Sequence, residues 1–180
     1  MRLRSPHLGY RRSCRGFSLI ELITVISLMG VIAVAIAGPT LTYMSKIRSR
    51  SAATRILADI RYVQRYAMNS RLRTWIVFST GSNNYRLYAE TSPGAGKATR
   101  TALTHPLDQS TGAVQFGSGT NLAVSISAVS INSTSEIEFD SWGKPHDGNS
   151  VALTASGTVT LSNGVTLTVY PASGLVEQAG

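Results

Sequence analysis

The sequence predicts an α+β fold in which one long N-terminal helix, transmembrane in its first half, packs on an antiparallel β-sheet or sandwich head. Three observations predict it. An apolar run covers residues 17–37, apolar residues recur with helical spacing over residues 41–72, and period-two alternation with turn residues fills residues 74–170. The 180 residues suffice for one small domain and one long helix.

The first half of the helix is the run from Phe17 to Ala37, which contains a single charged residue, Glu21. At about 1.5 Å per residue, a helical run of this length can cross the hydrocarbon core of a bilayer. An unpaired carboxylate inside that core is costly, so Glu21 is a candidate functional residue. We therefore expect residues 17–38 to form a transmembrane helix.

The second half of the helix, residues 39–73, is expected to be amphipathic. Gly38 and Pro39 should loosen or kink the helix, because proline removes a backbone donor. The apolar face, expected to pack on the sheet, consists of Ala53, Ile56, Ile60, Val63 and Ala67. The residues expected across the other, basic side are Arg48, Arg50, Arg55, Asp59, Arg61 and Arg65. This side can face solvent or contact a neighbouring subunit, lipid headgroups or nucleic acid.

The head, residues 74–180, is predicted to consist of strands. Alternating β-branched and aromatic residues predict a hairpin of strands 74–80 and 85–89. Asn163-Gly164 predicts a type I′ turn between strands 158–162 and 165–170. Prolines and glycines predict a long loop at residues 91–112. Further strands are expected at residues 113–116, 122–131, 136–139 and 151–155.

The net charge of +8 is unevenly distributed along the chain. Residues 1–16 contain five arginines, residues 46–73 contain eight basic residues and one acidic residue, and residues 74–180 contain four basic and seven acidic residues. The charge step near Arg73 predicts a domain boundary there. It also predicts that the basic helix of one subunit packs against the acidic head of another.

No sequence pattern is typical of an enzyme, and we expect no cofactor and no metal. The three histidines lack the spacing of metal ligands. Residues 94–97 lack the spacing of a phosphate-binding loop. His146-Asp147 is expected to be a surface turn. Glu136, Glu138 and Asp140 alternate along one strand and are expected to form an exposed polar face rather than a calcium site.

The stretch Arg15-Gly16-Phe17-Ser18-Leu19-Ile20-Glu21, followed by an apolar helix, resembles the class III leader of type IV pilins and pseudopilins. The resemblance implies that a prepilin peptidase cuts between Gly16 and Phe17, that Phe17 is N-methylated, and that Glu21 assists assembly. Residues 1–16 are then a leader peptide, and the only cysteine, Cys14, is lost with it. The implied location is the inner membrane with a periplasmic head, and then a filament with other pilins or pseudopilins.

Residues 57–68 and the strand 75–78 resemble the helix-to-first-strand region of the GspH/FimT group, which comprises minor pseudopilins of type II secretion and FimT-type minor pilins. Residues 136–143 and 165–174 also resemble patterns of that group. The resemblance implies a minor subunit of a type II secretion pseudopilus or a type IV pilus. The candidate contacts with partner pilins or with DNA are Arg48, Arg55, Arg61 and Arg65.

Two alternatives stay open. The first is a FimT-like DNA-uptake minor pilin, although residues 174–180 are acidic and apolar where DNA-binding FimT-type pilins carry a basic segment. Nucleic acid is therefore a partner that we do not favour. The second is a soluble secreted β-domain, in which residues 22–34 form an ordinary signal sequence and Ala35-Ile36-Ala37 is its cleavage site. Glu21 argues against the second, because a carboxylate weakens insertion of such a segment.

Overall fold

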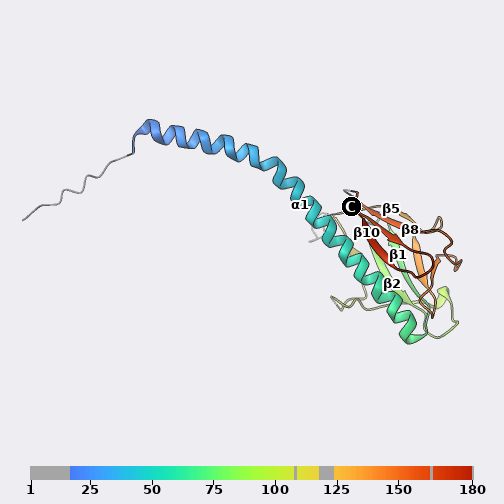
Figure 1. The fold of residues 1–180 in the computed structure, drawn as a ribbon. Helices are drawn as coiled ribbons and strands as arrows, with labels where there is room; N and C mark the ends of the chain where they lie inside the picture. Colours follow the sequence, from blue (N-terminus) through green and yellow to red (C-terminus); the bar gives the residue numbers. More distant parts are fainter. Residues whose placement is uncertain (1–16, 108, 118–123, 163, 180) are drawn as a thin grey trace, which may run out of the picture. The chain divides into compact units, whose positions relative to one another are not determined.

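One long helix and two antiparallel sheets make up the described part of the chain (Figure 1). The computed structural model describes residues 17–107, 109–117, 124–162 and 164–179, with the backbone alone for residues 37–42. The elements are α1 (Leu19–Ser70), β1 (Thr74–Ser79), β2 (Asn84–Ala89), the 3-10 helix η1 (Lys97–Thr99), β3 (Thr101–Ala102), β4 (Val114–Gln115), β5 (Ile126–Ser130), β6 (Glu136–Phe139), β7 (Pro145–Asp147), β8 (Gly157–Leu161), β9 (Thr166–Val169) and β10 (Val176–Ala179). The predicted α+β class is confirmed.

The chain divides into two compact units, the residues up to Leu41 and those from Thr42 onward, which we call the head unit. Helix α1 contributes to both units. Its helical backbone continues through Gly38 and Pro39, although a looser helix was expected there. A proline removes only one hydrogen bond of the ladder, and its fixed φ is compatible with a helix.

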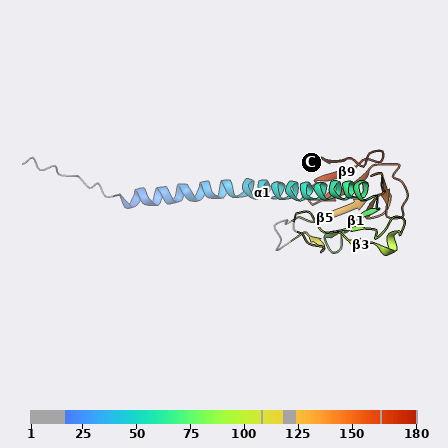
Figure 2. The same ribbon diagram turned by 90° about the horizontal axis from the view of Figure 1, so that it is seen from below.

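Two sheets form the β part of the head unit. The larger has the strand order β3-β2-β1-β6-β7, with β4 also paired to β2, and the smaller has the order β10-β9-β8-β5. In the larger sheet, Ile76 lies opposite both Leu87 and Ile137, so three buried apolar side chains cross its centre. The second half of α1 lies across the sheets, with β9 to one side and β3 to the other (Figure 2).

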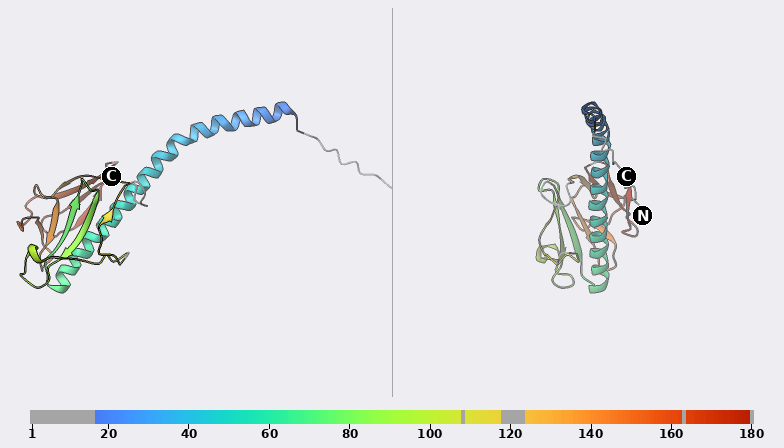
Figure 3. Two further views of the ribbon diagram at one scale, coloured as in Figure 1. Left: turned by 180° about the vertical axis from the view of Figure 1, so that it is seen from behind. Right: turned by 90° about the vertical axis from the view of Figure 1, so that its left-hand side faces the viewer.

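The predicted apolar face of α1 is confirmed as part of the core. Its five predicted residues are fully buried, and Ala52 joins them. They form one hydrophobic cluster with side chains of both sheets, among them Phe139 and Leu167. The two further views in Figure 3 show the helix running over this β part. Short alanine side chains on this face allow the helix backbone to come close to the sheets.

The placement of Asp59 on the basic side of the helix was wrong, because its side chain is buried. Asp59 follows Ile56 by three residues and precedes Val63 by four, so it shares their face. The Tyr85 hydroxyl donates to Asp59 Oδ2 at 2.5 Å, and His105 Nδ1 lies 3.4 Å from the same oxygen. Burial and then the neighbouring Asp59 raise the pKa of Tyr85. This cluster joins α1, β2 and the loop after β3.

The expectation of an exposed acidic face on β6 was also wrong. Glu138 is buried, and its Oε2 accepts the indole N–H of Trp75 at 2.9 Å. Glu136 pairs with Lys97 at 2.8 Å and with Arg100 at 3.0 Å. Both cations come from the predicted long loop, which contains η1 and β3 and folds back over the sheet. The acidic residues are evident in the sequence, but the loop that covers them is not.

Near β7, the predicted surface turn at His146-Asp147 and the predicted strand at 151–155 are both wrong. Asp147 is buried in the edge strand β7, and residues 151–155 contribute one isolated bridge to it. Asp147 Oδ1 accepts the backbone N–H groups of Asn149 and Val151 at 2.8 and 3.0 Å. Burial alone would raise the pKa of Asp147, but these hydrogen bonds outweigh it and lower the pKa. The carboxylate thus holds a tight turn where a strand was expected.

The predicted strands agree best where alternation is long. The predictions that are confirmed lie at β1, β2, β6 and the β8–β9 hairpin, while the strands expected at 113–116 and 122–131 are shorter, as β4 and β5. Residues 122 and 123 and Asn163 lie outside the described residues. Gly164 has φ 80°, as the predicted turn requires. Three short strands, β3, β7 and β10, lie at sheet edges or ends and were not predicted.

Gln64 of α1 forms hydrogen bonds to one turn of each sheet. Its Nε2 donates to the carbonyl oxygens of Gly143 and Ser173, each at 2.9 Å. Gly143 follows β6 of the larger sheet, and Ser173 precedes β10 of the smaller one. Gly174 has φ 65°, and a Cβ at that position would lie 2.6 Å from Gln64 Nε2. A glycine is therefore required where the last turn approaches the helix.

We predict that Tyr85→Phe destabilises the head unit by about 1–3 kcal/mol, because a buried carboxylate oxygen of Asp59 loses its donor. Denaturant unfolding of the full chain in detergent, followed by the fluorescence of the buried Trp75, measures this change. Tyr170→Phe is the matched control, since the Tyr170 hydroxyl bonds Glu177 at the surface. Equal stabilities of the two variants would contradict a structural role for the Asp59 cluster.

Candidate functional site

The first candidate site is the exposed apolar start of α1. From Leu19 to Ile36 the helix has 18 residues with a mean hydropathy of 2.6, and none of them is buried. It is long and apolar enough to cross a membrane. Phe17 precedes the helix and is 83% exposed, while Gly16 lies outside the described residues.

Glu21 lies in the first turn of α1. The Ser18 carbonyl accepts the N–H groups of Glu21 at 3.0 Å and Leu22 at 3.2 Å, which begins the helix. The free N–H groups of a first turn carry partial positive charge and stabilise a carboxylate there. Ser18 and Glu21 also have the spacing of a capping box, a signal in the sequence that could have predicted this helix start. Glu21 therefore has a local reason to lie at this position as well as the predicted role in assembly.

The four candidate arginines do not form one surface. Arg48, Arg61 and Arg65 are exposed, whereas Arg55 is half-buried. Arg55 is directed at Tyr85, where its charge opposes the rise in the pKa of the Tyr85 hydroxyl. Arg61 Nη2 lies 3.4 Å from the carbonyl oxygen of Val176 in β10. The helix thus uses two of these arginines for contacts within the head unit.

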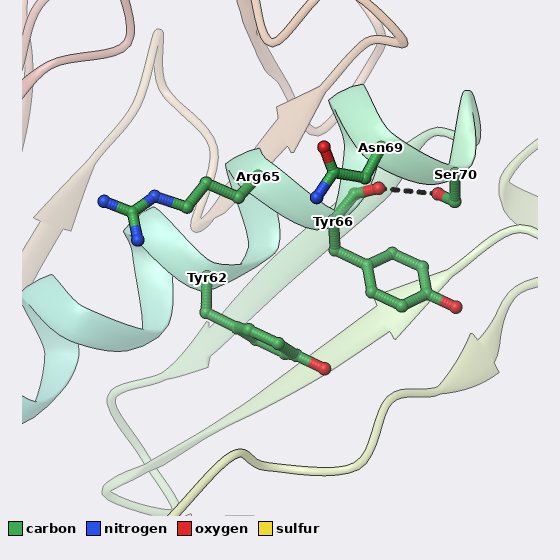
Figure 4. Close-up of a pocket in the computed structure, with 5 residues that line it drawn as sticks. All are labelled: Tyr62, Arg65, Tyr66, Asn69 and Ser70. Atoms are coloured by element: carbon green, nitrogen blue, oxygen red, sulfur yellow. Dashed lines mark hydrogen bonds between the residues drawn. The ribbon is translucent and has the colours of Figure 1, made fainter.

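Arg65 lines a groove on the last turns of α1. The groove has a volume of about 440 Å³, and its other lining residues are Tyr62, Tyr66, Asn69 and Ser70. Figure 4 shows both tyrosine rings projecting from one side of the helix, with Arg65 extending away from them. The ring centroids of Tyr62 and Tyr66 are 6.1 Å apart. An arginine, an amide and two aromatic rings together can bind an anionic or aromatic group.

The Tyr62 hydroxyl of this groove is a hydrogen-bond donor at neutral pH. Partial burial raises the pKa of Tyr62, and the neighbouring Tyr66 and Asp59 raise it further. The groove therefore contains a cation and hydrogen-bond donors, and its described lining includes no carboxylate. Such a lining complements acidic partners.

A smaller hollow of about 200 Å³ lies at the end of α1 and is lined by Met68, Arg71, Ser141 and Trp142. Trp142 is 80% exposed on the turn after β6. Asp140 Oδ1 fixes this turn by accepting the backbone N–H groups of Trp142 and Lys144, each at 2.9 Å. Exposed tryptophans are enriched at protein contacts, so this turn is a second candidate contact surface.

The surface charge of the head unit differs from its sequence charge. The described carboxylates are buried at Asp59, Glu90, Glu138 and Asp147, half-buried at Glu136 and Asp140, and exposed at Glu177. The exposed cations among the described residues are Lys46, Arg48, Arg50, Arg61, Arg65, Arg71, Arg73, Arg86 and Lys144. Among the described residues of the head unit, little acidity is exposed to complement the basic helix of a neighbouring subunit.

Metal ligation has no support in the described part of the chain. No group of three or more His, Cys, Asp or Glu side chains among those residues could hold a metal ion. The buried acidic residues instead accept hydrogen bonds or pair with cations, as Glu138 does with Arg73 at 3.3 Å.

Comparison with known proteins supports the interpretation of the N-terminus. Residues 11–37 match the family model described as the Prokaryotic N-terminal methylation motif. No curated protein and no solved structure matches the chain. The motif supports a type IV pilin-like protein, and it implies processing by a prepilin peptidase and assembly with other pilins. Because the match ends at residue 37, it does not distinguish the GspH/FimT group from other pilin-like proteins.

We predict that the mature chain begins at Phe17 with a methylated amine. Gly16→Val should leave the leader attached, since the resemblance places the peptidase cut after this glycine. Gly9→Val, a glycine substitution elsewhere in the leader, is the matched control and should be processed normally. Mass spectrometry of the native N-terminus measures both, and a mature chain that begins at Gly38 would instead show cleavage as an ordinary secretory signal.

Proposed function

We propose that this chain is a minor pilin or pseudopilin of the GspH/FimT type, a structural and assembly subunit of a type II secretion pseudopilus or a type IV pilus. The methylation motif over residues 11–37, with its only carboxylate in the first turn of a fully exposed apolar helix, carries this proposal. The helix anchors the subunit in the inner membrane before assembly. The head unit then contacts neighbouring subunits from the periplasmic side.

In the filament, we expect the Glu21 carboxylate to pair with the amine of Phe17 on an adjacent subunit. Residues 17–36 offer no cationic side chain to Glu21 within the subunit. The attraction between two charges is strong in an apolar environment, although desolvation cancels part of the gain. Assembly thus provides a partner that the single subunit lacks.

We predict that Glu21→Leu leaves membrane insertion and leader removal intact but lowers incorporation into filaments at least about tenfold, because a buried amine left unpaired costs more than about 1.4 kcal/mol. Glu21→Gln keeps the size and the hydrogen-bond acceptor, and it isolates the effect of charge. Membrane fractionation, leader removal and recovery with sheared filaments are measured on each variant. Normal incorporation of Glu21→Leu would show that the carboxylate has no role in assembly.

A DNA-uptake minor pilin is the second candidate function. The exposed cations of the head unit and the arginine and tyrosine groove favour it, because cations attract phosphates and aromatic rings stack on bases. The C-terminal segment does not favour DNA binding, because β10 is paired with β9 in a sheet and carries the acidic residue Glu177. We therefore keep subunit assembly as the main proposal and nucleic acid as its competitor.

We predict that Arg61→Glu with Arg65→Glu weakens co-purification with partner pilins roughly tenfold or more, because two exposed cations facing an acidic partner become repulsive. Arg86→Glu, an exposed substitution on β2, is the control. Unchanged partner binding together with loss of salt-dependent DNA binding would favour the DNA-uptake function.

A further inference from the structure

The segment of α1 from Tyr43 to Arg50, which we call the collar segment, has one side toward the β part of the head unit and one side exposed. Ser49 is fully buried, and its hydroxyl lies 3.4 Å from the carbonyl oxygen of Ser162. Tyr43 is 66% exposed, and Met44 and Ile47 are each 46% exposed. Large apolar side chains therefore cover the side of the helix that faces away from the head.

The cations of the collar segment lie on both flanks of this apolar side. At about 100° per residue, Tyr43, Ile47 and Met44 lie roughly 120°, 160° and 220° around the helix from Ser49. Lys46 and Arg50 lie at about 60° and 100°, and Arg48 lies at about 260°. An apolar strip with cations on both flanks is the pattern of helices that bind at a membrane surface.

Two cations of the collar segment, Lys46 and Arg48, have no ion-pair partner among the described residues. No acidic residue occurs between Glu21 and Asp59, and Asp59 is buried in the core. Lys46 and Arg48 are exposed and take part in none of the ion pairs of the described residues. Their ammonium and guanidinium groups are available to an anionic surface.

The distance along the chain places the collar segment next to the bilayer. With Glu21 at the inner boundary, the 20 uncharged residues 22–41 form a helix about 30 Å long, which equals the thickness of the hydrocarbon core. Tyr43 then lies at the outer boundary, where tyrosines are enriched. Lys46 and Arg48 follow within about 10 Å and reach the headgroups with their long side chains.

We infer that the collar segment binds anionic lipid headgroups of the outer leaflet, with Tyr43, Met44 and Ile47 toward the acyl chains and Lys46 and Arg48 on the phosphates. This inference rests on the membrane anchoring in the proposed function but not on filament assembly. Each cation near an anionic membrane contributes binding equivalent to about a fivefold change in the equilibrium. The contact holds the unassembled subunit at a defined depth and must be released when the subunit leaves the bilayer.

The test uses the full chain in vesicles, with single cysteines labelled by an environment-sensitive fluorophore. Cys14→Ser removes the only native cysteine. Labels are placed by Met44→Cys and Ile47→Cys, with Leu28→Cys in the apolar span and Ala58→Cys, exposed further along the helix, as references. The rate of label reduction by aqueous dithionite is measured in phosphatidylcholine vesicles with and without phosphatidylglycerol.

We expect phosphatidylglycerol to slow the reduction of labels at residues 44 and 47 by about fivefold or more, with no change at residue 58. Lys46→Gln with Arg48→Gln should abolish this lipid dependence, whereas the matched exposed pair Arg86→Gln with Lys144→Gln should preserve it. Added salt should weaken the protection.

Four results would overturn the inference while leaving the proposed function intact, provided that the label at residue 28 is protected. Labels at 44 and 47 could be as accessible as the label at 58. Their protection could be independent of phosphatidylglycerol or survive the double glutamine substitution. It could also rise with the ratio of protein to lipid, which would assign this side of the helix to a second copy of the chain. An accessible label at residue 28 would overturn both the anchoring and the inference.

Discussion

The head depends on one constraint, which is that a single face of α1 must pack against two sheets at once. Its alanines and β-branched residues bring the helix close to both sheets, and the same face carries Asp59 into the core. A buried carboxylate is tolerated only where a donor reaches it, so the Tyr85 hydroxyl must reach Asp59. His105 lies beside the same carboxylate oxygen. Gln64 extends the same requirement to the two turns that precede the edge strands β7 and β10. Helix, sheets and loops are therefore specified together.

Local periodicity made the helix face and the longer hairpins predictable, because those features depend on residues close in sequence. The misplaced features depend on long-range contacts. Glu136 and Glu138 were assigned to an exposed face because nothing near them in sequence reveals their partners. Trp75 donates to Glu138, and the loop residue Lys97 pairs with Glu136. No strand forms at 151–155, because Asp147 accepts backbone hydrogen bonds that stabilise a tight turn at the start of this segment. At the candidate site, Glu21 was predictable from its charge in an apolar run, whereas the groove at Arg65 required the packing of Tyr62 and Tyr66 to be known.

Charge counted along the sequence gave a misleading description of the surface. Residues 74–180 have more acidic than basic residues, yet their carboxylates mostly serve internal hydrogen bonds and ion pairs. Apart from the half-buried Arg55, the cations of α1 stay exposed, since long charged side chains are easily accommodated at a surface. The head unit therefore presents positive charge to its surroundings. Partners of this surface must bring their own acidic groups, as lipid headgroups, nucleic acid or a different pilin subunit can.

The position of Glu21 in the first turn bears on how a carboxylate can promote assembly. Stabilisation by the first-turn N–H groups is present in the free subunit and in the filament alike, so it makes insertion tolerable without favouring either state. An equilibrium shifts only through interactions that differ between its two states. A partner amine is present only after assembly, so pairing with it supplies such a difference. The first-turn N–H groups thus stabilise the Glu21 carboxylate in the bilayer, and the Phe17 amine of a neighbouring subunit stabilises it only in the filament.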